Sequence, residues 1–333
     1  LEKNSLNYLQ LINPLLQSSI SVLNSFLNLQ LTKKEIKIER VTKGIYDAST
    51  YFDCTSENFR FKFFLCVESK VLKDMYQLAF FEEKEKIDDD LIDFFGEVGN
   101  MIVGNAKNNF EGENSYKITT PAIIVGNRYI LSSLSKYPSI RVTFDSDIGD
   151  FSIHLIVDDL IKSTKSSSTR QNNLVTMEKI EHLDPILNST VNVFKNFLNF
   201  EIKEKSLVSK KVLVPKFDIS AFLDIYESDV EGKVVLNITK KLALEIYSTL
   251  VGETVNEVTD NVLDAVGEII NIITGNAKNE FQAKGLVYKL STPFIVNGKE
   301  QIIKNTSAIP FLSTMYWTSS GFFELSFSLY QKT

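Results

Sequence analysis

The sequence predicts an α+β fold that occurs twice in one chain. A polar motif at residues 96–107 returns almost unchanged at residues 267–278, and flanking segments repeat at the same offset. Runs rich in β-branched and aromatic residues are interrupted by amphipathic helical patterns that do not strictly alternate with them. Such an order is typical of a largely antiparallel sheet with long helices packed on one face. We therefore expect two tandem domains of this kind.

The domain boundaries follow from chain length and local composition. A chain of 333 residues favours two domains, and a half of about 170 residues can bury its own core. Residues 162–173 carry only polar side chains, which is the composition of a flexible connector. We predict a first domain at residues 1–161, a linker at 162–173 and a second domain at 174–333.

Three helices are expected in each half. The first has apolar residues at helical spacing, the second is short, and the third is long and follows an acidic first turn whose oxygens can accept free backbone N–H groups. The expected ranges are 15–26 and 186–197 for the first helix, 70–80 and 240–250 for the second, and a start at Asp88-Asp89-Asp90 and at Thr259-Asp260 for the third. Gly252 is predicted to cap the second helix of the second half.

Strands are expected wherever β-branched and aromatic residues dominate. The expected ranges are 51–54, 59–67, 118–125, 140–144 and 151–157 in the first half, and 212–226, 233–238, 290–296, 312–317 and 322–329 in the second. Glu231-Gly232 is predicted to form a hairpin turn. Thr120-Pro121 and Thr292-Pro293 are expected inside their strands.

Charge and composition exclude several classes of function. A formal net charge of −6 argues against binding to nucleic-acid phosphates. Cys54, Cys66, His154 and His182 are not repeated between the halves, which argues against a zinc site or a histidine-based triad and favours two reduced structural thiols. The sequence shows neither a signal peptide nor an apolar run long enough to cross a membrane. We expect a cytoplasmic protein without membrane contact.

The candidate functional residues lie on the long helix of each half. Asp93, Glu97 and Asn100 are spaced i, i+4 and i+7, so they share one stripe of the helix surface. The second half repeats the same residue types at the same spacing: Asp264, Glu268 and Asn271. The other side of each helix is apolar and should face the core: Leu91, Phe94, Phe95, Val98, Met101 and Ile102, and Leu263, Val266, Ile269, Ile270 and Ile273. The polar stripe should therefore face outward.

A structural explanation of this stripe is a surface Glu in salt bridges and an Asn that did not diverge. Asn is unfavourable inside a helix because its amide competes with the backbone. Its retention in both halves, while neighbouring positions changed, favours a functional role. Gly104, which follows the stripe in a Gly-Asn-Ala-Lys segment, is interpreted as a packing residue that lets another backbone approach.

The pattern Asp-x-x-x-Glu-x-x-Asn on a long helix, followed by Gly-Asn-Ala-Lys and a Thr-Pro strand, resembles the CheX branch of the CheC/CheX/FliY chemotaxis phosphatases. Both halves resemble it over most of their length. The resemblance implies hydrolysis of the acyl phosphate on a CheY-like response regulator. It implies that Asn100 and Asn271 position the attacking water and that Glu97 and Glu268 pair with the partner's lysine. Asp93 and Asp264 are assigned to partner binding.

The residue chemistry agrees with this implication. A carboxamide both donates and accepts hydrogen bonds, so it can hold a water with a lone pair directed at phosphorus, and positioning supplies most of the acceleration in phosphoryl transfer. No cofactor is expected in this chain, because magnesium would belong to the response regulator.

The two halves are also expected to associate with each other within the chain. Members of the resembled family often dimerise by joining sheet edges, so the halves are expected to form an intramolecular pseudo-dimer. A noncatalytic adaptor or flagellar-switch component that binds a response regulator is the alternative to an enzyme. A third possibility is that only the second half is active.

Overall fold

A computed structural model describes residues 8–39, 44–55, 59–108, 117–160, 184–204, 207–210, 212–213, 217–226, 230–283, 288–305 and 310–331. The linker predicted at 162–173 lies outside these residues. The boundaries 1–161 and 174–333 stay predictions.

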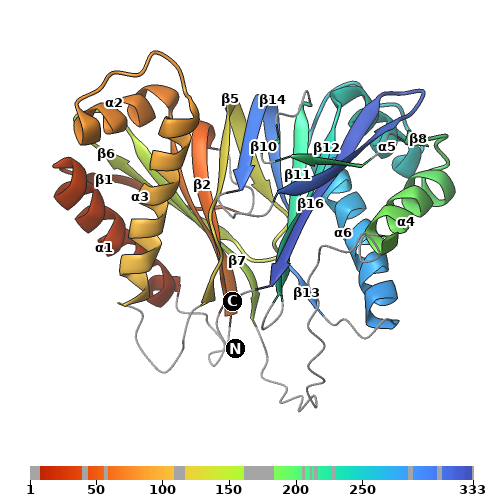
Figure 1. Cartoon of the computed structure of the whole chain (residues 1–333), viewed down its shortest axis with the longest axis horizontal. Coiled ribbons are helices and arrows are strands. Elements are labelled where there is room, and N and C mark those ends of the chain that lie inside the picture. Colours follow the sequence, from red (N-terminus) through yellow and green to blue (C-terminus); the bar gives the residue numbers. More distant parts are fainter. Residues whose placement is uncertain are drawn as a thin grey trace, which may run out of the picture.

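Both halves contribute to one antiparallel sheet, with helices on its two outer flanks (Figure 1). The first half contains α1 (Tyr8–Leu27), β1 (Thr32–Glu39), β2 (Ile45–Thr55), β3 (Phe59–Val67), α2 (Ser69–Phe80), α3 (Asp89–Lys107), β4 (Lys117–Ile118), β5 (Ala122–Ser133), β6 (Ser139–Asp145) and β7 (Phe151–Leu160). The second half contains α4 (Asp184–Asn192), the π-helical η2 (Val193–Phe197), β8 (Lys203–Glu204), β9 (Val208–Lys210), β10 (Val212–Leu213), β11 (Ile219–Tyr226), β12 (Val230–Ile238), α5 (Lys240–Val251), α6 (Asp260–Ala283), β13 (Lys289–Leu290), β14 (Phe294–Asn305), β15 (Phe311–Trp317) and β16 (Phe322–Gln331). The predicted α+β class is confirmed.

The two halves meet at β5 and β14. The main strand order is β1-β6-β7-β3-β2-β5 in the first half, followed by β14-β11-β12-β16-β15-β8 in the second. β5 and β14 pair antiparallel from Ala122 opposite Asn305 to Ser133 opposite Phe294. The two strands hold equivalent places in their halves. Their backbone hydrogen bonds make the sheet continuous across the junction.

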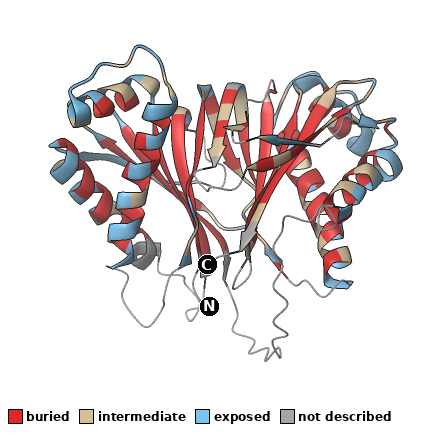
Figure 2. Ribbon diagram, viewed as in Figure 1, coloured by how far each residue is buried: buried red, intermediate tan, exposed pale blue. Residues whose placement is uncertain are grey.

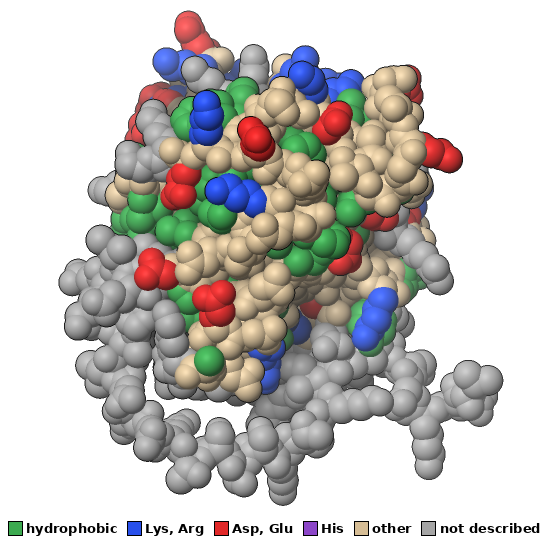
Figure 3. Space-filling model, turned by 90° about the vertical axis from the view of Figure 1, so that its right-hand side faces the viewer, with side chains coloured by type: hydrophobic (Ala, Val, Ile, Leu, Met, Phe, Trp, Pro, Cys, Tyr) green, Lys and Arg blue, Asp and Glu red, His purple; other side chains and the backbone are tan. Residues whose placement is uncertain are grey.

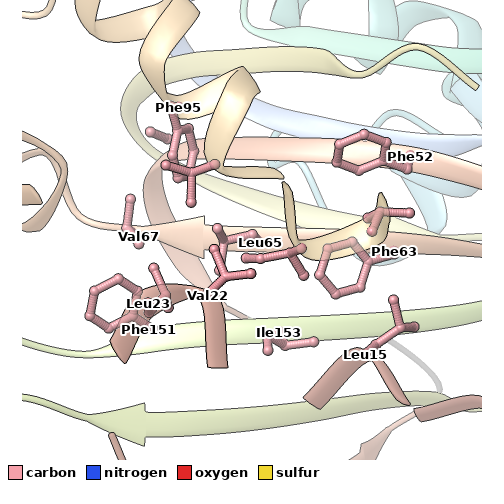
Figure 4. Packing of buried hydrophobic residues seen from close by; sticks show 14 of the residues in the cluster. Leu15, Val22, Leu23, Phe52, Phe63, Leu65, Val67, Phe95, Phe151 and Ile153 are labelled. Atoms are coloured by element: carbon pink, nitrogen blue, oxygen red, sulfur yellow. The ribbon is translucent and has the colours of Figure 1, made fainter. Parts of the chain in front are cut away.

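Each half has its own apolar core between helices and sheet, and a third core lies between the halves. Figure 2 shows buried residues along the strands and on the inner faces of the helices. In Figure 4, side chains from α1, α3 and the strands interdigitate in the first core: Leu15, Val22, Leu23, Phe63, Leu65, Phe95 and Phe151. In the third core, the ring of Phe294 lies 4.8 Å from that of Tyr51 and 4.6 Å from that of Phe222, centroid to centroid. Aromatic residues of both halves therefore pack together.

A buried network of charges also crosses between the halves. Its members are Asp53, Arg60, Lys62 and Asp158 from the first half and Asp224 and Lys233 from the second. The Nζ atom of Lys62 lies 2.7 Å from a carboxylate oxygen of Asp224 and 3.1 Å from one of Asp158. Burial raises the pKa of Asp158. Burial acts in the same direction on Asp224, but Lys233, Lys62 and Arg60 outweigh it and lower the pKa of that carboxyl.

The buried His154 makes the stability of the fold dependent on pH. The Tyr46 hydroxyl lies 2.6 Å from Nε2 of His154, and burial, with a smaller contribution from Arg141, lowers the imidazole pKa to about 3. In the unfolded chain this imidazole has a pKa of about 6.5 and is protonated below that pH, whereas in the folded chain it stays neutral. The free energy of unfolding therefore decreases as pH falls below about 6.5. We expect the free energy of unfolding to decrease by about 1.2 kcal/mol between pH 6 and pH 5.

Urea unfolding at several pH values measures this slope. His154→Gln removes the titrating group and should flatten the slope in that window. An equally steep slope in the variant would assign the effect to another group.

Three details of the predicted strands are wrong. The run expected at 212–226 is divided into β10 and β11, and residues 217–218 are not in a strand. Glu231 and Gly232 lie inside β12, not in a turn, with Gly232 opposite Ile225. A Cβ on Gly232 would lie 2.3 Å from Cδ1 of Leu329, so this glycine serves close contact between strands. The Thr-Pro pairs interrupt their strands, since β4 and β13 end before them and β5 and β14 begin after them. Proline lacks the N–H that a sheet ladder requires.

The ends of the two short helices differ in a way that affects stability. Gly252 ends α5 in the left-handed conformation, with φ of 76°, as predicted. Phe81 holds the equivalent place after α2 with φ of 59° and is 93% exposed. A side chain in this conformation costs about 1 kcal/mol, and the exposed ring provides little packing in return.

Phe81→Gly should therefore raise the free energy of unfolding by about 1 kcal/mol. Gly252→Ala, the matched change in the second half, should lower it by a similar amount. Thermal unfolding should show a higher Tm than wild type for Phe81→Gly and a lower Tm for Gly252→Ala. A Phe81→Gly protein less stable than wild type would contradict the proposed cost of the left-handed conformation at Phe81.

None of the helices in the described part of the chain combines the length and the apolar content that crossing a membrane requires.

Candidate functional site on the long helices

The two long helices are fixed by their first turns and by their apolar sides. Asp88 caps α3, and its side chain accepts a hydrogen bond from the backbone N–H of Leu91 at 3.0 Å. The carbonyl of Thr259 accepts from the N–H of Leu263 at 3.1 Å at the start of α6. The predicted apolar residues are buried in both helices except Met101, which is 40% exposed. The polar sides are thereby held outward.

The stripe on α3 is exposed as predicted. Asp93 and Glu97 are exposed and Asn100 is half-buried. Nδ2 of Asn100 donates a hydrogen bond to Oε1 of Glu97 at 3.3 Å. The carboxylate and the carboxamide can therefore reach the same small volume in front of the helix.

Asp93 is held by a residue from the other half, a contact that no sequence pattern predicts. Nζ of Lys304, on β14, lies 2.7 Å from Oδ1 of Asp93 and 3.7 Å from Oδ1 of Asp89. Lys304 extends from the strand that joins the halves, so the second half contributes a cation to the site of the first.

The stripe on α6 has a different electrostatic setting. Asp264 and Glu268 are exposed and Asn271 is half-buried. The pKa of Asp264 is raised by partial burial and by the negative charges of Asp260 and Glu268. The first site thus has a lysine beside its aspartate, whereas the second has an aspartate among carboxylates.

An apolar groove borders the stripe in the first half. It lies between α1, α2 and α3, and its lining residues are Phe26, Tyr76, Phe80, Asp90, Asp93, Phe94, Glu97 and Met101. The ring of Phe94 contacts those of Tyr76 and Phe80 edge-to-face, at centroid distances of 5.4 Å and 5.6 Å. At equivalent positions the second half has Phe197, Tyr247, Val251, Ala265 and Ile272. The surfaces beside the two stripes therefore differ more than the stripes do.

The two stripes lie on opposite flanks of the molecule (Figure 1). Figure 3 faces the flank that carries the helices of the second half, where acidic and basic side chains are interspersed with apolar ones. Each stripe can therefore be approached by its own partner molecule.

The interpretation of Gly104 as a packing residue is wrong. A Cβ on Gly104 or on Gly275 would meet no heavy atom of the described residues within 4 Å. Close helix-to-sheet packing depends on other glycines, since a Cβ on Gly99 would lie 2.8 Å from Phe52, and one on Gly267 would lie 2.2 Å from Leu134.

Cys54 and Cys66 are free and buried, and burial raises the pKa of both thiols, that of Cys66 to about 12. Both are structural, as predicted. Among the described residues, no three His, Cys, Asp or Glu side chains form a group that could hold a metal ion.

These features define a tandem α+β protein whose two domains each display a Glu and an Asn on an exposed helix face. The family model of the chemotaxis phosphatase CheX matches residues 55–145 and 219–315, which together make up more than half of the chain. The chain belongs to the CheX family.

Solved structures of similar proteins each cover about half of this chain. A CheC-like superfamily protein from Shewanella sp. PV-4 is 28% identical, covers 46% of this chain and 99% of its own, and has a TM-score of 0.44. The chemotaxis protein CheX from Vibrio vulnificus is 27% identical, with coverages of 45% and 99% and a TM-score of 0.43. A CheX–CheY–BeF3–Mg complex from Borrelia burgdorferi is 22% identical, with coverages of 45% and 99% and a TM-score of 0.39. A comparison with curated proteins gave no match.

Proposed function

We propose that this protein is a phosphatase that removes the aspartyl phosphate of a CheY-like response regulator in chemotaxis signalling. One observation supports the proposal most strongly. In a chain of the CheX family, a Glu and an Asn one helical turn apart are displayed on an exposed face in both halves. The 3.3 Å contact between Nδ2 of Asn100 and Oε1 of Glu97 supports the proposal, because groups this close could enter one partner pocket together.

The proposed reaction uses these side chains to position other groups. The carboxamide of Asn100 or Asn271 holds a water in line with the phosphoryl group. The water oxygen forms a bond to phosphorus while the bond from phosphorus to the aspartate oxygen breaks. The products are inorganic phosphate, which keeps the water's oxygen, and a free aspartate carboxylate on the receiver domain, with the remaining proton passing to solvent. Magnesium bound by the receiver would neutralise charge on the phosphoryl oxygens.

The acidic side chains are assigned to docking. Glu97 and Glu268 pair with the receiver's lysine, which a carboxylate can bind with a charge-assisted hydrogen bond. Asp93 and Asp264 contribute to partner binding at the edge of the same face. Because the receiver domains of chemotaxis are partners inside the cell, we place this activity in the cytoplasm.

We also propose that the chain is a pseudo-dimer, in which the junction of β5 and β14 replaces the edge-to-edge contact of two separate copies. The backbone pairing from Ala122 to Ser133 supports this, because these edge strands are then unavailable to a second chain. A monomer is expected by sedimentation of the purified chain. A stable dimer through these strands would contradict the proposal.

The phosphatase proposal is tested by phosphate release from a phosphorylated receiver domain in the presence of magnesium. A substoichiometric amount of the chain should accelerate release over many turnovers. The adaptor alternative predicts binding to the phosphorylated receiver without any acceleration, and that result would replace the enzymatic proposal.

A further inference from the structure

Gly104 and Gly275 lie on the same helix face as the proposed functional residues. Each glycine follows the Asn of its stripe by four positions, about one helical turn. The stripes are identical over five positions at the same spacing in both halves: Asp93, Glu97, Asn100, Gly104 and Lys107, and Asp264, Glu268, Asn271, Gly275 and Lys278. The glycine is the member of each stripe that has no side chain.

The packing of the described residues does not require either glycine. No heavy atom of the described residues lies within 4 Å of the position that a Cβ would take, and neither residue has a positive φ. Gly is markedly less favourable than Ala in a helix interior, because the unfolded chain gains more backbone freedom from it. The neighbouring Gly267 differs, since a Cβ there would collide with Leu134. Nothing in the described part of the chain therefore explains why this position lacks a side chain twice.

We infer that Gly104 and Gly275 provide clearance for the docked receiver domain, whose backbone approaches α3 and α6 closely at these points. This inference rests on the proposed function. A backbone segment seated against the glycine lets the helix approach near enough for Asn100 or Asn271 to reach the phosphoryl group. A methyl group at that point would keep the partner about 1 Å farther away, and a displacement of that size can reduce a reaction rate about a hundredfold.

The inference predicts that stability and activity change in opposite directions. In the protein carrying both Gly104→Ala and Gly275→Ala, we expect the Tm to rise by about 2 °C, because Ala favours the helix. We expect phosphate release from the phosphorylated receiver to slow at least about tenfold, with a matching loss of affinity for the receiver activated with beryllofluoride. Leu at both positions should weaken binding further while keeping the helix stable.

Asn100→Ala with Asn271→Ala is the control. This protein keeps the clearance, so it should lose rate but keep its affinity for the activated receiver. If the Ala variants at the two glycines are more stable and fully active, the inference is overturned while the proposed function stands. If they are less stable in the absence of a receiver, the fold itself needs the glycines and the inference also fails. A wild-type chain that neither binds nor dephosphorylates the receiver overturns the proposed function and the inference together.

Discussion

Replacing Asn100 and Asn271 together by Ala should reduce the acceleration of receiver dephosphorylation by a factor of about 100 to 1,000. The expected loss is large because the Asn side chain holds the attacking water next to phosphorus, so the water does not have to arrive by chance from solvent. Positioning of this kind supplies much of the rate acceleration in phosphoryl transfer. Each Asn is half-buried at the surface of its helix, and among the described residues neither side chain has a hydrogen bond to the core that its loss would break. The thermal stability of the double variant should therefore be at least that of wild type, because Ala favours a helix more than Asn does.

The single variants distinguish the contributions of the halves. If both sites act independently, Asn100→Ala and Asn271→Ala should each leave a substantial part of the rate. If only the second half is active, Asn271→Ala should have the full effect and Asn100→Ala none. The measurement is the initial rate of phosphate release at saturating receiver for wild type, the two single variants and the double variant. A double variant as fast as wild type would exclude Asn as the group that positions water.

Asp224→Ala should destabilise the fold by about 3 to 5 kcal/mol, the largest effect expected for a residue away from the proposed sites. Asp224 is buried and accepts hydrogen bonds from Lys62 at 2.7 Å and from Lys233 at 2.9 Å. Its removal leaves two buried ammonium groups short of a counter-charge. Because Lys62 belongs to the other half, the substitution should weaken the junction as well as the second domain.

The control is an exposed ion pair of the same length. Lys34 and Asp150 are also 2.7 Å apart, but their side chains are about half exposed, and solvent screening leaves such pairs with little effect on stability. Asp150→Ala should thus have little effect on urea unfolding. The lowered pKa of Asp224 adds a pH test, since its stabilisation is present above about pH 4 and is lost as pH falls below that value. Equal effects of the two substitutions would contradict the burial argument.

The sequence predicted the features that repetition or strong patterning made visible. The duplicated Glu and Asn were found because they stayed fixed at one spacing, and the long helices because each has an apolar side and an acidic first turn. By contrast, β1 was missed. Its charged residues alternate with Ile36 and Ile38, which are 52% and 70% exposed, so no buried face produced a signal. The segment is a strand because its backbone pairs with β6.

The parts of the site that were missed depend on contacts between distant segments. Lys304 reaches Asp93 only because β14 pairs with β5, a register that no local pattern encodes. The apolar groove requires α1, α2 and α3 to bring Phe26, Phe80 and Met101 together. Local propensity does not specify contacts between distant segments, so the sequence does not predict this lysine contact or this groove.

The most direct measurement is the structure of this chain bound to a magnesium-loaded receiver domain activated with beryllofluoride. We predict a receiver on the outer face of α3 or α6, with the carboxamide of Asn100 or Asn271 beside the beryllofluoride group and Glu97 or Glu268 against the receiver's lysine. A receiver seated on any other surface, with both helix faces left open to solvent, would contradict the account.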